Sequence, residues 1–265
     1  MASHRRNHFV DPHHELHKTW YGREDSHTCD ICQIKLAGLV GYSCHACNID
    51  VHQQCADSFT ESISFFLHPP HSSLKLRRIL PSDPPRRCNL CRWPCPRGTF
   101  AYRCTECGFD VHPLCSILPA RFPSPSHPGH DLCMVSSQSP GYCSACHHSI
   151  DSCEYVCSCS SLRLHILCAT NAPAGAAQRS YGPVIPGYNP ANQGSYYGLV
   201  TPAYNPAIIQ GSYYYGGPAI TGNNYNTGSG HQSFLTAIAK FLLKTGIHVG
   251  LSEVLSAALS DAFNN

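Results

Sequence analysis

One pattern of ligand residues, Cys-x2-Cys-x4-His-x2-Cys led by a tyrosine, organises this chain. It reads YSCHACNIDVHQQC over residues 42–55 and returns as YRCTECGFDVHPLC over residues 102–115. A third, damaged copy, YVCSCSSLRLHILC, covers residues 155–168. An earlier Cys-x2-Cys pair precedes each copy, and Cys88 stands 59 residues after Cys29, while Cys143 stands 55 residues after Cys88. Three units of nearly constant period predict one fold built three times.

The composition favours metal ligation over disulfide bonding. The chain of 265 residues has 18 Cys and 18 His, and only 13% of its residues are charged. Its first residues contain no apolar run that would form a signal-peptide core, so nothing in the sequence argues for export to an oxidising compartment. A disulfide framework would not require His52 and His112 to stand at one fixed offset from their cysteines. We therefore predict a zinc protein of the cytoplasm, the nucleus or both.

Charge and hydropathy exclude two general classes of partner. The formal net charge is +2, and a zinc site with three thiolates and one histidine carries about −1. Three such sites leave the zinc-loaded chain close to neutral, which predicts no general attraction to a polyanion. No segment has the roughly 18 uninterrupted apolar residues needed to cross a bilayer, so we predict no transmembrane segment.

Counting ligands indicates a role for the connectors between repeats. Each repeat offers a leading histidine, two Cys pairs and the His-x2-Cys end, which makes seven ligands, whereas two closed tetrahedral zinc sites need eight. The connectors read HPPH over residues 68–71 and HPGH over residues 127–130, and the chain before repeat one reads DPHH, with Asp11 in the leading place. From this pattern we infer that His68 closes repeat one and His127 closes repeat two. The three repeats are then opened by His14, His71 and His130.

At these residues the chain resembles the plant Cys/His-rich divergent C-one domain proteins. These are relatives of the phorbol-ester/diacylglycerol-binding zinc finger of protein kinase C. The resemblance covers residues 11–169 and rests on the recurring ligands, the aromatic lead-in and the HP-x-H connectors. It implies a fold of small zinc-stabilised α+β modules in tandem, each with short β-hairpins, a short helix and a cross-braced pair of zinc sites.

The resemblance also implies how the ligands are grouped. One site of repeat one would be Cys29, Cys32, His52 and Cys55, and the other would be His14, Cys44, Cys47 and His68. Repeat two would have Cys88, Cys91, His112 and Cys115, together with His71, Cys104, Cys107 and His127. Repeat three would keep one intact site of Cys143, Cys146, His165 and Cys168.

The second site of repeat three departs from the family pattern. Ser160 stands where a cysteine is expected, with Cys159 beside it, and no histidine follows Cys168 until His231. We expect His130, Cys157 and Cys159 to form a weak or empty site unless Cys133 or Cys153 completes it. The chain would then hold five tightly bound zinc ions, within a range of about five to six.

The remaining segments differ in character. We predict a flexible end over 1–10, repeats over 11–68, 69–127 and 128–169, a disordered Pro/Gly/Asn/Tyr-rich linker over 170–231, and amphipathic helices over 232–265. The first helix would begin after the N-cap Ser233, end at Gly246 and present Phe234, Ile238, Phe241 and Leu242 on one face. The second, from Ser252, would present Leu251, Leu255, Leu259 and Phe263.

Several functions stay open at this level. The eight basic residues between Lys75 and Arg103 could bind nucleic acid or anionic lipid, or could offset the charge of nearby thiolates. A PHD-type finger would use Cys88 and Cys91 to complete the first unit, but no Cys pair follows Cys168 to complete the last. A zinc-dependent or redox enzyme would need a general base, for which Glu154 is the one candidate beside the incomplete site. We predict a non-catalytic binding or scaffold module for a protein partner, with self-association through the C-terminal helices as an alternative, and the resemblance adds a signalling or stress-response role.

Overall fold

The computed structural model describes residues 5–68, 71, 73–123, 129–137, 139–159, 161–171, 235–243 and 250–263. The chain divides into two compact units, residues 1–178 with 227–265, and residues 179–226. The second unit lies outside the described residues. So does the predicted linker, except for its first two residues, Thr170 and Asn171, which end a helix.

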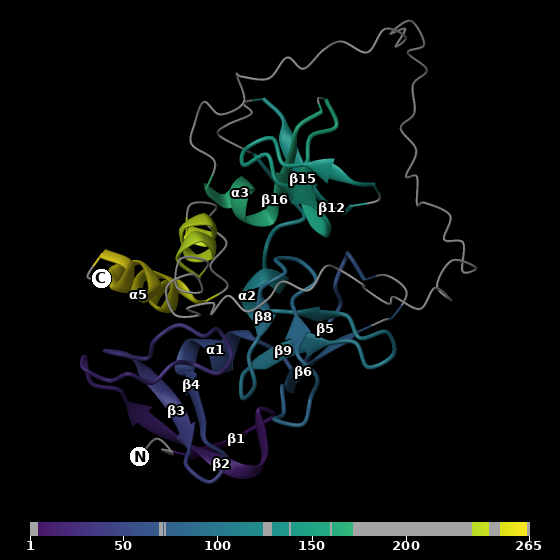
Figure 1. Cartoon of the computed structure of the whole chain (residues 1–265). Helices are drawn as coiled ribbons and strands as arrows, with labels where there is room; N and C mark the ends of the chain where they lie inside the picture. Colours follow the sequence, from purple (N-terminus) through teal and green to yellow (C-terminus); the bar gives the residue numbers. More distant parts are fainter. Residues whose placement is uncertain are drawn as a thin grey trace, which may run out of the picture. The chain divides into compact units, whose positions relative to one another are not determined.

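Each repeat forms a four-stranded antiparallel sheet (Figure 1). Repeat one has the order β1 (Arg5–His8), β2 (Asp11–Trp20), β3 (Val40–Cys44) and β4 (Ile49–His52). Repeat two has the order β5 (Ser62–Ile63), β6 (Leu74–Arg78), β9 (Phe100–Arg103) and β10 (Asp110–Val111). Repeat three has the order β11 (Arg121–Pro123), β12 (Asp131–Ser136), β15 (Cys153–Val156) and β16 (Arg163–His165). The prediction of one fold built three times is confirmed.

The first strand of every sheet comes from the chain that precedes its repeat. Residues 5–8, predicted as part of a flexible end, form β1 and pair with β2. Ser62 and Ile63 follow the helix of repeat one but pair with Lys75 and Leu74 of repeat two. The chain has therefore entered the sheet of repeat two by residue 62, well before the HPPH connector.

A tight turn carries the first Cys pair of each repeat. In repeats two and three it lies in two-stranded hairpins, β7 (Arg86–Arg87) with β8 (Pro94–Cys95) and β13 (Gly141–Tyr142) with β14 (Ser149–Ile150). In repeat one a single bridge joins Thr28 and Lys35. The residue after the second cysteine has a left-handed backbone in all three, with φ of 63° at Gln33, 64° at Arg92 and 60° at His147. Strain of this kind in a residue other than glycine is typical of a functional site, here the turn that brings two sulfurs together.

A short helix follows the His of each motif. These helices are α1 (Gln53–Ser58), α2 (Pro113–Ser116) and α3 (Ile166–Asn171). His52 and His112 are the N-cap residues of α1 and α2, and Cys55 and Cys115 lie within the helices. Because these helices are so short, side-chain contacts must hold them rather than their own hydrogen bonds.

The tyrosine that leads each motif ties one repeat to the one before it. Tyr102 and Tyr155 are almost fully buried, and their hydroxyls donate to the carbonyls of Thr60 (2.8 Å) and Pro119 (2.7 Å) at the ends of the preceding repeats. In repeat one the guanidinium of Arg6 lies 5.0 Å from the ring centroid of Tyr42.

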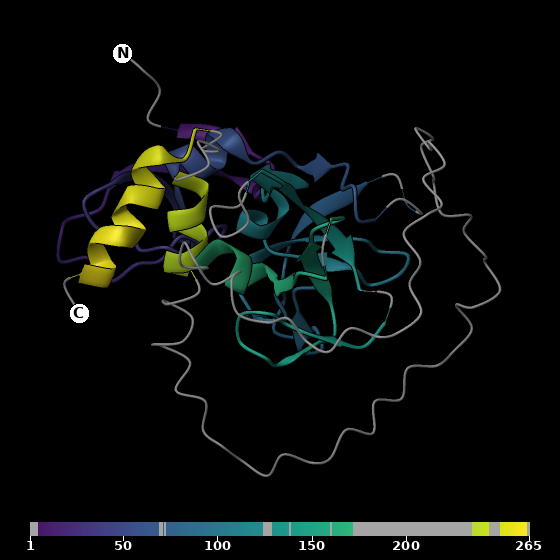
Figure 2. The same cartoon turned by 90° about the horizontal axis from the view of Figure 1, so that it is seen from above.

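Two C-terminal helices pack on the repeats, over residues 235–243 and in α5 (Ser252–Phe263); Figure 2 shows them beside each other. The buried apolar residues Ile238, Phe241 and Leu242 confirm most of the predicted first face. Phe234, Ser233 and Gly246 lie outside the described residues. Of the predicted second face, Leu251, just before α5, and Leu255 within it are buried, together with Val254, whereas Leu259 is half-buried and the side chain of Phe263 lies outside the described residues. No helix in the described part of the chain has the length and apolar character to cross a membrane.

Candidate metal centres

The buried ligand set of repeat one is formed by the first Cys pair and the His-x2-Cys end. Donor atoms of Cys29, Cys32, His52 and Cys55 all lie within 4.8 Å of one another. Nδ1 of His52 is 3.3 Å from Sγ of Cys32 and 3.7 Å from Sγ of Cys55. The other ring nitrogen, Nε2, lies 3.0 Å from the carbonyl of Lys35. A backbone acceptor at Nε2 fixes the tautomer that leaves Nδ1 free to bind a metal.

The same geometry recurs in repeats two and three. Cys88, Cys91, His112 and Cys115 form one cluster, and Cys143, Cys146, His165 and Cys168 form the other. Nδ1 of His112 lies 3.4 Å from Sγ of Cys91, and Nδ1 of His165 lies 3.3 Å from Sγ of Cys146. Nε2 of each ring faces a backbone carbonyl 3.0 Å away, that of Pro94 or Ser149. The structure brings together the three sets of residues that the family resemblance implied.

Electrostatics in these clusters call for a cation. Burial by itself lowers the pKa of His52, but the Cys32 and Cys29 thiolates raise that pKa to about 11. The pKa of His112 is likewise raised, by Cys88 against the effect of burial. Several thiolates buried around one imidazole are unfavourable without a positive charge among them, because burial disfavours every charged form. A Zn²⁺ ion supplies that charge, and thiolate sulfur and imidazole nitrogen are the donors it prefers.

The second site of repeat one contains an aspartate that sequence reasoning did not count as a ligand. Asp11, His14, Cys44 and Cys47 place their donor atoms within 4.8 Å of one another. Nδ1 of His14 lies 3.2 Å from Sγ of Cys47. Oδ1 of Asp11 accepts from the amides of His13 (3.2 Å) and His14 (3.1 Å). Oδ2 is buried and has no hydrogen-bond partner among the described residues.

The carboxylate of Asp11 is in the right form to bind zinc. Burial raises its pKa, but the neighbouring Cys44 and Cys47 thiols and the two amides outweigh burial and hold the pKa at about 2. An ionised, buried carboxylate oxygen without a partner is costly unless it binds a cation. The residues present therefore fit a zinc ion held by aspartate, histidine and two cysteines.

His68 belongs to repeat two, and its assignment to repeat one was wrong. It lies with His71, Cys104 and Cys107, and all four donor atoms are within 4.8 Å of one another. Nδ1 of His71 is 3.2 Å from Nε2 of His68 and 3.2 Å from Sγ of Cys104, while Sγ of Cys107 is 3.5 Å from Nε2 of His68. The physical reason is the path of the backbone, because β5 already pairs with β6 before His68 is reached.

This correction changes the interpretation of both HP-x-H connectors. Both histidines of HPPH serve the repeat that follows them, so repeat two needs no ligand from His127. Asp11 is the first ligand of repeat one, as His68 is of repeat two. The clue in the sequence was alignment, because Asp11 of DPHH occupies the position of His68 in HPPH. His127 itself lies outside the described residues.

The second site of repeat three is only partly described. Sγ of Cys157 lies 2.7 Å from Sγ of Cys159, so the displaced cysteine still faces its partner. His130 directly precedes β12. Ser160 is outside the described residues. Cys133 and Cys153, the two alternative ligands, lie within β12 and β15, and burial raises the pKa of the Cys153 thiol to about 11. Together with the clusters above, these residues are compatible with about five to six zinc ions.

Glu154, the candidate general base of the sequence analysis, is paired with an arginine. Glu154 is buried, and both its oxygens accept from the guanidinium of Arg163, at 2.7 Å from Nε and 2.6 Å from Nη2. The carboxylate of Glu154 is therefore held in a bidentate ion pair, and both its oxygens already accept hydrogen bonds.

Most of the basic segment is committed to internal contacts. Arg86 and Arg103 both pair with the buried carboxylate of Asp110. Arg92 approaches Asp151, and the side chains of Arg87 and Arg97 donate to backbone carbonyls. Arg78 donates to three backbone carbonyls. The basic residues thus stabilise the fingers, largely through carboxylates and carbonyls rather than through the thiolates considered in the sequence analysis.

Comparison with known families agrees with this geometry. The family model of the C1 domain matches the chain twice, over residues 11–56 and 66–116. The chain carries two C1 domains. The first match begins at Asp11, and the second begins just before His68, so each C1 domain includes its own leading pair of ligands. Repeat three lies outside both matches but repeats the sheet order of the other two and has a Cys3His cluster, of which Cys143 is buried and the other three ligands are half-buried. Searches of curated proteins and of solved structures gave no match.

Proposed function

We propose that this chain is a non-catalytic zinc-finger protein that binds a protein partner and acts as a scaffold in signalling or stress response. The observation that carries the proposal is the closure of the ligand clusters. Each of the five clusters above offers four protein donors within 4.8 Å. A tetrahedral zinc ion with four protein ligands has no position left for water or substrate, and such ions are structural. C1 domains are regulatory binding modules, and the fingers would act in the cytoplasm, the nucleus or both.

A protein partner is favoured over a lipid because the one apolar loop is not presented to solvent. Diacylglycerol recognition needs apolar side chains that insert into a membrane. In the loop QIKLAGLVG, Ile34 and Leu36 are fully buried. Among the described residues, the exposed large apolar side chains are Trp20, Phe66, Leu80 and Tyr142, and they are distributed over all three repeats rather than gathered at one loop.

A protein partner is also favoured over nucleic acid. Phosphate binding needs several free cations on one surface. Six of the eight basic residues between Lys75 and Arg103 already pair with carboxylates or donate to backbone carbonyls of the fingers. Lys75 and Arg77 are exposed on β6, and Arg87 and Arg97 are exposed as well but each donates to a carbonyl.

The test compares three classes of ligand on the zinc-loaded full chain. We expect specific proteins to be captured from cells by the wild type and by Arg77→Met, and to be lost when Cys88→Ser opens the cluster of repeat two. We expect less than a twofold gain in binding to vesicles when diacylglycerol is added, and no salt-sensitive binding to DNA or RNA. Diacylglycerol-dependent vesicle binding, tight nucleic-acid binding, or zinc-dependent hydrolysis of ester or amide substrates would contradict the proposal.

A further inference from the structure

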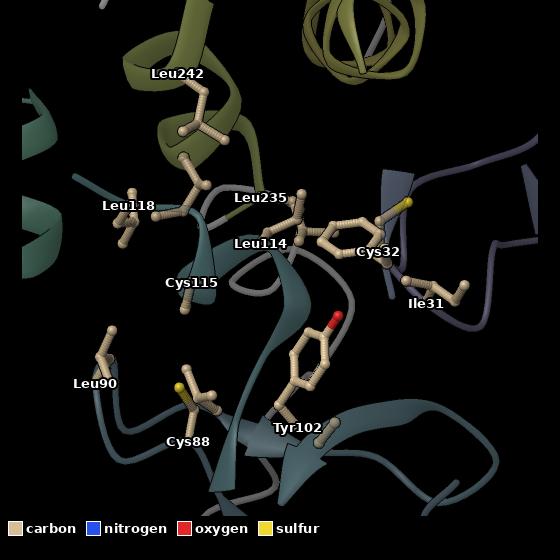
Figure 3. Close-up of a cluster of buried hydrophobic side chains, with 14 of the residues drawn as sticks. Ile31, Cys32, Cys88, Leu90, Tyr102, Leu114, Cys115, Leu118, Leu235 and Leu242 are labelled. Atoms are coloured by element: carbon tan, nitrogen blue, oxygen red, sulfur yellow. The ribbon is translucent and has the colours of Figure 1, made fainter. Parts of the chain in front are cut away.

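One C-terminal helix contacts the short helix of repeat one, and the other shares a buried cluster with the equivalent position of repeat two. The second residue after the ligand histidine is Gln54 in α1 and Leu114 in α2. The amide of Val254, in the first turn of α5, lies 3.4 Å from Oε1 of Gln54. Leu114 lies in the same buried cluster as Leu235 of the other C-terminal helix (Figure 3). The helices that follow the zinc-binding histidines therefore form a surface on which other helices pack.

Apolar contacts extend this surface onto repeat three. The ring of Phe241 meets Phe122 of β11 edge to face, with centroids 4.7 Å apart and an interplanar angle of 81°. Phe122 in turn packs edge to face on Tyr155, at 4.8 Å. Figure 3 places Leu242 and Leu235 in one cluster with Leu118 and Leu114. We call this the docking surface: Gln54, Ser58, Leu114, Leu118 and Phe122.

The C-terminal helices have the pattern of a ligand for such a surface. In residues 235–243 every side chain is buried except Lys240, which is exposed, and Leu243, which is half-buried. In α5 one face is buried, with Leu251 before it, while Ser252, Glu253 and Ser256 are exposed. Gly250, at the start of this helix, sits so close to repeat one that an added Cβ would lie 2.9 Å from Oγ of Ser58.

The fingers and the helices are specified by separate parts of the sequence. Each finger has its own sheet and ligand clusters, and metal binding supplies the folding free energy of so small a module. Helices of nine to twelve residues are marginal alone in water, so these helices gain their order by packing on another surface. Between the two parts lie residues 172–234, whose sequence has no hydrophobic period.

We infer that the finger array has a docking surface for an amphipathic helix, and that residues 235–263 are its intramolecular ligand. Because one chain carries both, the surface is occupied at any protein concentration. A helix with the same spacing of apolar residues in another protein would compete for it, and each such exchange would expose the C-terminal helices. This docking of the C-terminal helices on the fingers does not depend on which partner the fingers bind.

The experiment places a protease site between Val200 and Thr201 of the full chain and cleaves it after folding with zinc. We expect the C-terminal fragment to stay with the fingers in size-exclusion chromatography. An isotope-labelled synthetic peptide of residues 232–265 should replace it within hours, as followed by native mass spectrometry. In Phe241→Asp the retained fraction should fall at least tenfold, whereas in the matched control Lys240→Asp it should stay within twofold of the wild type.

Zinc content, measured on every variant, shows whether the fingers remain folded. Immediate loss of the wild-type fragment on cleavage would overturn the inference, because the docking surface would then not bind the helices. A fragment that stays bound but does not exchange over days would overturn it as well, because the helices would be a permanent part of the core. Equal retention in Phe241→Asp and the wild type would show that the Phe241–Phe122 contact does not carry the docking.

Discussion

Nε2 of His68 lies 3.5 Å from Sγ of Cys107, so the histidine before the Pro-Pro connector belongs to the repeat that follows it. The ring also stacks on Phe109 of the same repeat, with centroids 4.7 Å apart and an interplanar angle of 11°. All four donors of this cluster therefore come from residues 68–107, within one finger.

His68→Ala should open the second site of repeat two and leave repeat one intact. We expect Cys104 and Cys107 to become alkylated at least tenfold faster, because loss of a zinc ligand frees the thiolates. Cys44 and Cys47 should keep their wild-type rates. Mass spectrometry of alkylated peptides gives both rates, and His45→Ala, at an exposed position outside the clusters, is the control. Faster alkylation of Cys44 and Cys47 would restore the assignment of His68 to repeat one.

Asp11→Ala should weaken zinc binding at the second site of repeat one by more than the 10–100-fold or so that loss of an outer-shell partner costs. The buried Oδ2 is the fourth donor, and its removal leaves three ligands. Competition with a chromogenic chelator measures the change. The matched control is His13→Ala, which alters the neighbouring exposed side chain but keeps the amide that donates to Asp11. Unchanged chelator competition in Asp11→Ala would show that Asp11 is not a ligand.

Arg78→Met should loosen the junction between repeats one and two. Its guanidinium donates to the carbonyl of Cys47 at 2.6 Å, to Asn48 at 2.6 Å and, within repeat two, to Gly98 at 2.8 Å. Hydrogen bonds from a charged group contribute about 1.5–3 kcal/mol each at most, and less where solvent reaches them. We expect the free energy of unfolding to fall by about 2 kcal/mol and the amides of 47–48 to exchange faster. Arg77→Met, on the exposed face of the same strand, should change neither quantity.

Gly41→Ala should disrupt the sheet of repeat one. A Cβ on Gly41 would collide with the carbonyl oxygen of Val51, and it would lie 2.8 Å from the Tyr21 ring and 2.9 Å from Leu36. Overpacking of a core costs about 1–3 kcal/mol, and more where backbone is the obstacle. Gly22→Ala is the matched control, since nothing lies within 4 Å of a Cβ there. In thermal unfolding, zinc-loaded Gly41→Ala should have a lower melting temperature than zinc-loaded Gly22→Ala. Equal melting temperatures would contradict the close approach at Gly41.

The zinc content should be six ions per chain rather than the five predicted from sequence. That prediction rested on Ser160 standing at a ligand position and on the lack of a histidine soon after Cys168. The second reason no longer applies, because leading ligands close the second site of repeat two. Cys159→Ser should then reduce the count to five, while Cys133→Ser should leave six. Native mass spectrometry of the freshly purified chain gives the count. Five ions in the wild type would show that the slipped Cys159 does not act as a ligand.

Much of this structure follows directly from the sequence. The ligand residues Cys29, Cys32, His52 and Cys55 recur in register along the chain, and the family resemblance that they carry implied the grouping that the structure shows. The periodic spacing of apolar residues likewise predicted the two C-terminal helices, one containing Ile238 and the other beginning at Ser252. These features are local or repeated, so a single chain displays them without knowledge of its path in space.

Only the tertiary structure decided which ligands meet where the chain passes from one repeat to the next. The letters HPPH are equally compatible with His68 closing repeat one or opening repeat two. The β5–β6 pairing of Ser62 with Lys75 settles the choice, because it moves the chain into the second sheet before His68. Asp11 is the same case, since an aspartate is identified as a ligand only when its oxygen is buried beside two cysteines. Strand pairing and burial arise from contacts between distant residues, which spacing along the chain does not encode.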